Sequence, residues 1–234
     1  MREEGAAKVR FPHGGNEAIL INTGGGLAGG DDFAFDISAG PSASLTVTTQ
    51  AAERVYRTLG PPASVSVSLK AEAGALLHWL PQESILFDGA SLSRRIEADL
   101  AETAALLAVE TVILGRAAMG ETIHHAMLRD RWRIRQGGRL IFADDIAFDG
   151  PPPATRATLK DAGALATVVL VSDAAEALID DIRDLAGDIG SASAWSGKLV
   201  ARLVTVDGFE LRKVLIPVLS RLAGQNALPK VWSL

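Results

Sequence analysis

Short runs in which every second residue is apolar recur through the first two thirds of this chain. They lie at residues 44–48, 64–69 and 131–135, and each is too short to form a helical stripe. Side chains that alternate in this way point to opposite faces of a strand, so one face can be buried and the other solvated. The pattern predicts a mainly β fold of short, half-buried strands.

A turn followed by a small residue and an aliphatic pair recurs along the same region. Ala43, Ala75 and Ala105 mark three of these turns and lie 32 and 30 residues apart. Stacked β layers give such a spacing when each layer closes in a tight turn, and small residues let successive turns approach closely. We therefore expect an irregular, β-helix-like stack of sheets. The alternative is that the recurrence only reflects the abundance of alanine.

Two segments near the C-terminus depart from the β pattern. At 173–187, Asp173 and Glu176 can form a capping box ahead of apolar residues at helical spacing. At 209–223, apolar residues follow the i, i+3, i+4, i+7 rule, although Pro217 removes one interior hydrogen bond. We predict an α-helix in each segment, the second bent or begun near its proline.

Glycine and proline mark two further features. Gly137 and Gly138 separate two β-like runs, which predicts a hairpin tip at 136–138. The run Gly150-Pro151-Pro152-Pro153 is the stiffest spacer in the chain, but few strand candidates follow it. We interpret it as a loop within one domain that spans residues 1–234.

Composition excludes several classes of protein. The chain has no cysteine, so disulfide scaffolds and thiolate metal sites are excluded. Its formal charge of −5 leaves no broad basic surface for nucleic acid or anionic lipid. No apolar run approaches a membrane span, and the first residues are charged where a signal peptide needs an apolar region. We expect a cytoplasmic protein with no nucleic-acid or membrane partner.

The glycine-rich segment 24–30 matches the spacing G-x-G-x-x-G of dinucleotide-binding loops. Such a loop must open a helix that meets the pyrophosphate, whereas Asp31, Asp32 and strand-like alternation follow here. Two carboxylates would also repel a phosphate. The alternative is a backbone that approaches another segment so closely that only glycine fits.

Three glutamates, Glu83, Glu110 and Glu121, follow apolar stretches. An isolated buried charge is costly, so such carboxylates must be paired, protonated or in contact with water. Arg116 is a candidate partner. Salt bridges that lock the β layers are one interpretation, which the residues alone favour. The other is a wet, acid-lined passage for a divalent cation.

The histidines and a search for known catalytic motifs give little support for a metal site or an enzyme. Glu121 and His124 would converge on a metal if their segment were helical, but on a strand His124 and His125 would face opposite sides. Ordinary surface or partly buried histidines are the simpler interpretation, and His78 is expected to be a strand residue. The sequence has no G-x-S-x-G, H-E-x-x-H or P-loop motif.

Four motifs, taken together and in this order, carry a resemblance to a known family. They are INTGGGLAGGD at 21–31, LTVTTQAAERVYR at 45–57, WLPQESILF at 79–87 and ETVILGRAAMGE at 110–121. In this arrangement they resemble the UreD family of urease accessory proteins, also called UreH. Weaker similarity continues through the hairpin, the C-terminal helix and the ending at 228–232.

The resemblance implies a maturation factor without catalytic activity of its own. It would bind the urease apoprotein and act with UreF and the GTPase UreG to assemble the dinuclear nickel site. The family fold is an irregular β-helix-like stack with two helices, which agrees with the patterns above. Members are thought to offer nickel a water-filled route, so we expect no tightly bound cofactor and nickel only in transit.

The same resemblance implies roles for individual residues. We expect the wall of the passage to include Gly24, Gly25, Gly26, Gly29, Gly30, Asp31, Thr49, Gln50 and Arg116. Candidate transient nickel contacts are Glu83, Glu110, Glu121 and His124. Oxygen ligands without a thiolate suit weak, exchanging contacts. The 209–223 helix is one candidate surface for docking UreF or urease.

The chain departs from the family pattern at both ends. Family members usually carry strands before the stretch 8–12, where this sequence almost begins, so an exposed sheet edge is expected if those strands are absent. The family's Pro-Arg-x-Trp ending reads Pro229-Lys230-Val231-Trp232, which loses the planar fork of arginine. A rival interpretation is a freestanding enzyme in which Glu83 and Glu121 form an acid/base pair beside a pocket.

Overall fold

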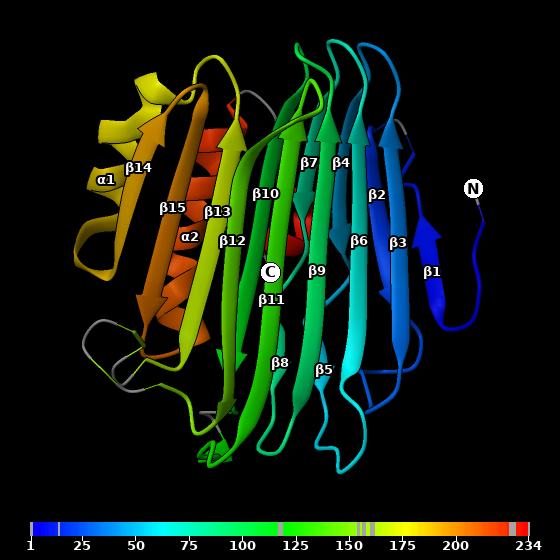
Figure 1. Ribbon diagram of the computed structural model, residues 1–234, viewed down its shortest axis with the longest axis vertical. Coiled ribbons are helices and arrows are strands. Elements are labelled where there is room, and N and C mark those ends of the chain that lie inside the picture. Colours follow the sequence, from blue (N-terminus) through cyan, green and yellow to red (C-terminus); the bar gives the residue numbers. More distant parts are fainter. Residues whose placement is uncertain are drawn as a thin grey trace.

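The computed structural model describes residues 2–13, 15–116, 119–153, 155, 158–159, 162–224 and 228–233, and in them two β-sheets face each other (Figure 1). The main path of the larger sheet is, in spatial order, β1 (Ala7–Arg10), β2 (Glu17–Asn22), β4 (Ser44–Thr49), β7 (Leu76–Leu80), β10 (Ala105–Leu114), β13 (Ala164–Val171), β15 (Lys198–Thr205) and β14 (Gly190–Trp195). Off this path, β5 (Glu53–Val55) pairs with β8 (Ser84–Leu86), which pairs with β10. The smaller sheet is β12 (Arg139–Gly150), β11 (Ala126–Gln136), β9 (Ser91–Leu100), β6 (Ala63–Ala71) and β3 (Asp32–Ala39). The predicted mainly β fold is confirmed.

Most of the chain winds as a coil that alternates between the two sheets. Successive passes pair in parallel, β2, β4, β7 and β10 in the larger sheet and β3, β6, β9 and β11 in the smaller. At the turns, Leu76 N donates to Ala43 O (2.8 Å) and Ala105 N donates to Ala75 O (2.9 Å). The recurrence of alanines therefore reflects stacked coils. Leu76 lies opposite Ala105, so Ala104 is the residue that aligns with Ala75.

The coil ends in the predicted hairpin. Gly137 and Gly138 have φ angles of 56° and 78°, which glycine adopts without strain, and they join β11 to the antiparallel β12. Beyond the prolines at 151–153, β13 returns to the larger sheet and pairs antiparallel with β10. The last third of the chain thus extends the same sheet that the coil builds.

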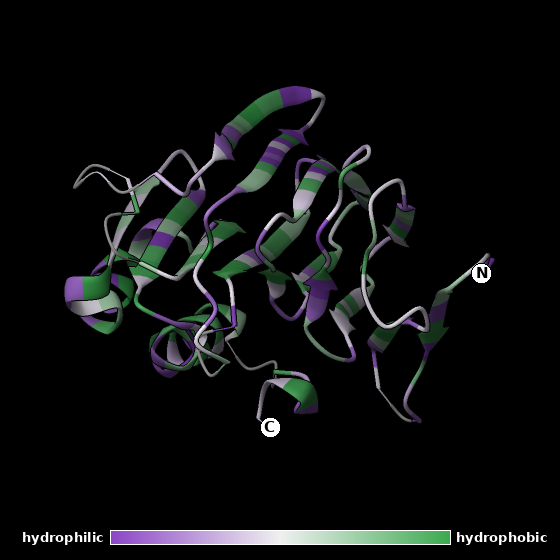
Figure 2. Cartoon of the chain, turned by 90° about the horizontal axis from the view of Figure 1, so that it is seen from below, coloured by the Kyte–Doolittle hydropathy of each residue, from purple (hydrophilic) through white to green (hydrophobic). Residues whose placement is uncertain are grey.

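The predicted helix at 209–223 is confirmed as α2 (Gly208–Ala223), with Pro217 inside it. The Asp207 side chain caps the first turn by accepting a backbone hydrogen bond of 2.9 Å, and Gly224 ends the helix with φ 65°. The buried face of α2 packs with α1 against the outer face of the larger sheet, on the side away from the smaller sheet (Figure 2).

The predicted helix at 173–187 is shorter in the structure, where α1 covers Ile179–Ala186. Three 3₁₀ turns are also present in the described residues: η2 (Glu176–Leu178), η3 (Gly187–Ile189) and η4 (Lys230–Trp232). The predicted capping box at Asp173 is wrong, because the Glu176 carboxylate instead accepts a hydrogen bond from Gly197 N (3.1 Å) in the β14–β15 turn. The chain therefore enters the helix later than its sequence pattern suggests.

Three apolar clusters make up the core. One lies between the helices and the larger sheet, and two lie between the sheets, nearer to opposite ends of the strands. Among the described residues, neither α1 nor α2 has the length and hydropathy that a membrane-crossing helix needs.

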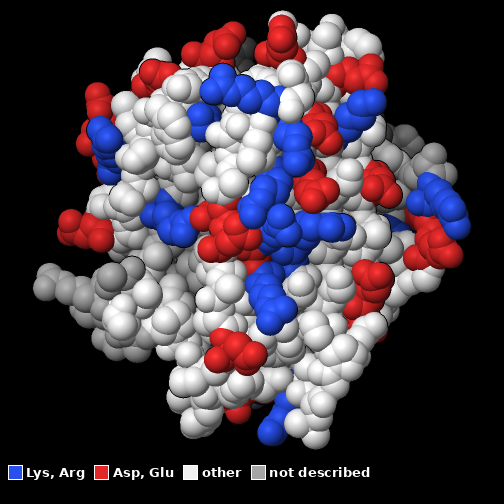
Figure 3. All heavy atoms as spheres, viewed as in Figure 1, with Lys and Arg blue, Asp and Glu red and all other residues white. Residues whose placement is uncertain are grey.

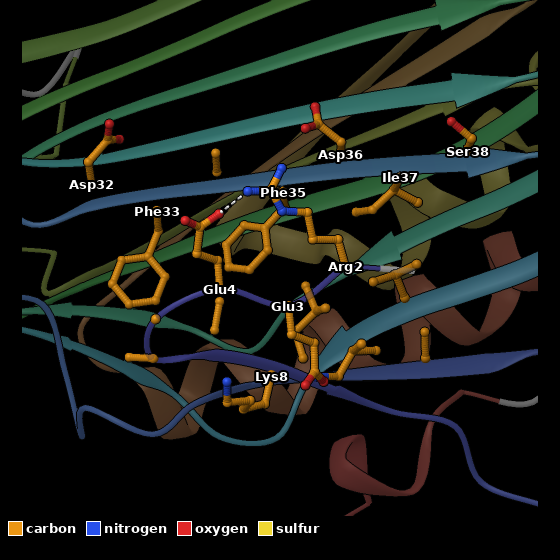
Figure 4. Close-up of a pocket in the computed structure, with 18 of the residues that line it drawn as sticks. Arg2, Glu3, Glu4, Lys8, Asp32, Phe33, Phe35, Asp36, Ile37 and Ser38 are labelled. Atoms are coloured by element: carbon orange, nitrogen blue, oxygen red, sulfur yellow. Dashed lines mark hydrogen bonds and ion pairs between the residues drawn. The ribbon is translucent and has the colours of Figure 1, made fainter.

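At the N-terminal end, β1 and β3 are the outermost strands of the two sheets. A cavity of about 900 Å³ opens between them. Figure 4 shows Phe33, Phe35 and Ile37 pointing from β3 toward the N-terminal segment, whereas Asp32 and Asp36 point to the other side of that strand. Within the described part of the chain, no further strand pairs with the outer edge of β1 or β3, although Val9 N of β1 donates to the Glu3 carboxylate (2.8 Å).

Candidate functional site

One layer of polar side chains interrupts the apolar interior between the sheets. Four strands each contribute one inward-facing residue to this layer: Arg94 on β9, Glu110 on β10, Asp130 on β11 and Thr167 on β13. On each of these strands, the residues two positions away on either side belong to the two different inter-sheet apolar clusters. Because side chains alternate along a strand, the polar residue must face the same interior.

Six more inward-facing polar residues continue this level across the sandwich, each beside apolar neighbours of the same clusters. We call the whole set the polar layer. Its members are Asn22, Thr49, Glu53, Ser84, Arg94, Glu110, Asp130, Asp144, Thr167 and Arg202.

An arginine between two carboxylates forms the centre of the polar layer. The Arg94 guanidinium lies 2.5 Å from a Glu110 oxygen and forms a two-pronged contact with Asp130, at 2.5 and 3.1 Å. It also donates to Ser84 Oγ (3.2 Å), while Trp79 Nε1 donates to the second Glu110 oxygen (2.7 Å). The three charged side chains are all less than 5% exposed. One buried cation therefore joins strands of both sheets.

Burial and charge together set the protonation of this centre. Burial raises the pKa of Glu110 to about 7, against the opposing effect of Arg94 and with reinforcement from Asp130. Burial also disfavours the charged form of Arg94, but the two carboxylates outweigh it and raise the arginine's pKa, so Arg94 keeps its proton. Glu110 can therefore gain or lose a proton near neutral pH.

The polar layer reaches the surface at one edge of the sandwich. There Arg202 on β15 forms an ion pair with Asp144 on β12, and the two side chains are 39% and 22% exposed. Between this pair and the centre lies Thr167, directly opposite Glu110 in the sheet register. Its buried hydroxyl has no hydrogen-bond partner among the described residues.

At the other edge, the polar layer meets a small cavity. Asn22 Nδ2 donates to Glu53 (3.0 Å), and Glu53 lies beside Ser84 in the β5–β8 register. The cavity holds about 180 Å³, and its lining includes Asn22, Thr49, Gln50 and Glu53. Burial raises the pKa of Glu53, partly opposed by the hydrogen bond from Asn22. Residues of the first two family motifs thus meet at one end of the polar layer.

The glycine-rich loop supports this end by close packing. A Cβ on Gly26 would lie 2.4 Å from the Tyr56 ring, and one on Gly29 would lie 1.9 Å from Thr58 Oγ1. The chain then continues into β3 and not into a helix, so the dinucleotide-binding arrangement is excluded. Asp31 accepts a hydrogen bond from Ala28 N (2.8 Å) and so closes the turn at the end of the loop.

Glu83 lies outside the polar layer, in the loop beneath α2. Its carboxylate pairs with Arg212 of that helix at 2.7 Å. Arg212 also donates to Gln82 (2.9 Å) and to the carbonyl of Trp232 (3.2 Å), and the Trp232 indole donates to Leu80 O (3.1 Å). This glutamate joins the third family motif, the helix and the C-terminal ending.

Glu121 and His124 lie in the connection between β10 and β11. Arg116 contacts both Glu121 oxygens, at 2.9 and 3.0 Å, and this pairing lowers the pKa of Glu121. The amides of His124 and His125 both donate to Asp88, and the His124 ring is 78% exposed. The two histidines lie in a loop that precedes β11. They are therefore neither on a helix, where Glu121 and His124 would converge, nor on a strand, where the two rings would face opposite sides.

The sequence-predicted nickel contacts therefore occupy three separate places, and only Glu110 is in the polar layer. Within the described part of the chain, no group of three or more acidic or histidine side chains is placed to hold a metal ion. Glu83 and Glu121 are each paired with an arginine and line neither of the two cavities above, which disfavours an acid/base pair.

Sequence reasoning missed Arg94, Asp130 and Glu53. One signal in the sequence could have found such residues. In Leu92-Ser93-Arg94-Arg95-Ile96, Arg94 occupies a position where the alternation of apolar residues calls for an apolar side chain. Such a charge must find a partner across the interior.

Comparison with known proteins gives a consistent result. The profile described as UreD urease accessory protein matches residues 1–233. Urease accessory protein UreD of Agrobacterium fabrum is 50% identical over an alignment of 238 positions, which covers 99% of this chain and 84% of that protein. The proteins of the same name from Rhizobium rhizogenes and Rhodopseudomonas palustris (strain BisA53) are 48% and 45% identical, each over 99% of this chain and over 88% and 83% of their own lengths. This chain therefore belongs to the UreD family of urease accessory proteins.

Proposed function

We propose that this protein binds the urease apoprotein together with UreF and the GTPase UreG, and that it helps to insert nickel into the urease active site. In this proposal nickel crosses the protein along the polar layer. The observation that supports it is the layer itself, which extends between the sheets from the surface pair Arg202–Asp144 to the cavity at Glu53.

The chemistry of the layer suits a cation in transit. Carboxylate, hydroxyl and amide oxygens interact with Ni²⁺ but hold it less firmly than thiolates or several imidazoles would. Arg94 places a fixed positive charge between Glu110 and Asp130 and so opposes a long-lived metal complex there. A tight site would trap the ion, whereas a sequence of weak contacts lets it move.

The carboxylates are better suited to passage and support than to catalysis. Glu83 and Glu121 have arginine partners that fix them in place, and we assign them to stabilising the loops around the passage. We accordingly propose a scaffold without catalytic activity of its own, for which nickel is cargo and not a resident cofactor.

The test is co-expression of the urease subunits and accessory proteins with and without this chain, followed by measurement of nickel per urease active site and of urease activity. Both should fall when the chain is absent. Unchanged nickel loading without the chain would contradict the maturation role.

Variants then test the route. Glu110→Gln is close in shape and keeps an oxygen that can accept from Trp79, so the protein should fold and still co-purify with urease while nickel loading falls. Glu97→Gln is the matched control, since the Glu97 side chain is 45% exposed and lies on β9 of the facing sheet, outside the polar layer. If Glu110→Gln unfolds the protein, the carboxylate serves the fold. If it folds, co-purifies and loads nickel normally, the route does not depend on Glu110.

A further inference from the structure

A column of arginines crosses the outer face of the smaller sheet. On β11 the inward positions are buried, and every outward position from 129 to 135 is arginine. Arg95 on the adjacent β9 lies directly opposite Arg131 in the sheet register. Figure 3 shows the resulting basic stripe near the centre of this face. The arginine column consists of Arg95, Arg129, Arg131, Arg133 and Arg135.

This arrangement is unfavourable for the isolated protein. Like charges directly opposite each other in a sheet are destabilising, and Arg131 faces Arg95 in this way. Two carboxylates provide partial compensation. Asp145 lies 2.7 Å from Arg133 and 3.8 Å from Arg131, and Glu97 lies 3.9 Å from Arg95. Among the described residues, Arg129 has no carboxylate within ion-pair distance. A chain of net charge −5 does not acquire such a column through general basicity.

Several of the side chains beside the column on the outer face of the smaller sheet are small. Ser64, Ser66 and Ser68 occupy three of the four outward positions of β6, with Lys70 at the fourth, and serines also begin β9. On β12, Ala143 and Ala147 lie opposite Arg133 and Arg129. Both helices lie on the far side of the molecule, against the larger sheet (Figures 1 and 2). Arg95, Arg129 and Arg131 are therefore exposed among small side chains. Arg133 is only 19% exposed and donates to the carbonyl oxygens of Trp132 and Asp144.

The spacing of the column indicates what it can bind. Outward side chains of one strand repeat about every 7 Å, which is also the spacing of alternate residues in an extended polypeptide. Guanidinium groups bind carboxylates through two parallel hydrogen bonds, which a lysine cannot do. One extended segment with acidic alternate residues would match the column along its length.

We propose that the arginine column is a docking surface for an acidic, extended segment of a partner protein. Acidic residues beside the column, Glu97 and Asp99 on β9 and Asp145 on β12, favour this partner over nucleic acid. They leave room for one row of carboxylates but repel the broad phosphate surface of a duplex. The partner differs from the nickel cargo, so this inference does not depend on the proposed passage.

The experiment measures binding of a fluorescein-labelled peptide that alternates glutamate and serine, by fluorescence anisotropy at low and physiological salt. Arg129→Gln/Arg131→Gln should weaken binding about tenfold, as expected when two charge pairs are lost. The control Lys8→Gln/Arg10→Gln removes the same charge from β1 and should change affinity less than twofold. A peptide with glutamine in place of glutamate should not bind.

Three results would overturn the proposal. The first is no binding of the acidic peptide at low salt, with the variants and the parent protein equally folded by circular dichroism. The second is an equal loss of affinity in the β1 control, which would attribute binding to net charge alone. The third is a duplex DNA probe that binds at least as tightly as the peptide and is equally weakened by the column variant.

Discussion

Removing the arginine at the centre of the polar layer tests whether the ion pairs of Arg94 hold the two sheets together. Arg94→Met keeps a long unbranched side chain but leaves Glu110 and Asp130 without their cation. The change removes contacts of 2.5 to 3.1 Å with the two carboxylates, all between side chains less than 5% exposed, and the 3.2 Å hydrogen bond to Ser84. Breaking a buried ion pair by removing one partner costs about 3–5 kcal/mol, so we expect the free energy of unfolding to fall by that amount.

The assay is urea denaturation at neutral pH, followed by tryptophan fluorescence. Arg95→Met is a matched control, because Arg95 is the next residue in the chain but faces solvent, and its loss should change stability by less than about 0.5 kcal/mol. Combining Arg94→Met with Glu110→Gln and Asp130→Asn should restore much of the stability, since no buried charge is then unpaired. A loss below about 1 kcal/mol for Arg94→Met would refute the reasoning, because Glu110 and Asp130 would then not depend on this cation.

Three further predictions concern protonation, capping and close packing. Folding raises the pKa of Glu110 from 4.5 to about 7, so the folded state binds the proton more tightly than the unfolded state does. The free energy of unfolding should therefore fall by roughly 3 kcal/mol as pH rises from about 4.5 past 7. Glu110→Gln should lack this dependence in urea titrations at several pH values, and an unchanged pH profile would contradict the assignment. Asp207→Ala should cost about 1 kcal/mol by removing the α2 cap, whereas Asp207→Asn should cost little; equal losses in thermal melts would show that the cap is not responsible. Gly29→Ala should lower the melting temperature clearly because its Cβ would clash with Thr58, while Gly40→Ala, which meets no neighbouring atom, should not; similar melting temperatures would argue against close packing.

Local sequence signals were sufficient to predict the elements whose structure depends on neighbouring residues in the chain. Alternating apolar residues predicted the strands, and two glycines at positive φ predicted the hairpin tip. The α2 helix followed from its apolar spacing and its terminal glycine. The predicted capping box at Asp173 does not form, because the Glu176 carboxylate accepts a hydrogen bond from Gly197 in a distant turn.

The candidate site needed information from beyond the local sequence. Trp79 and Glu110 are 31 residues apart, as are Asn22 and Glu53, because a parallel coil places each residue beside one from the next pass. The recurrence of alanines indicated such a coil. The number of residues in each turn of the coil depends on the loops and on the strand register. This number decides which polar side chains meet.

The sequence by itself determined the strands, the hairpin, the C-terminal helix and the membership of a family through four ordered motifs. Only the tertiary structure decided which charges meet. Glu83, Glu110 and Glu121 look alike in sequence, yet only Glu110 faces the space between the sheets. The physical reason is that a side chain's face follows from local alternation, whereas its partner follows from the way successive turns of the coil align the two sheets.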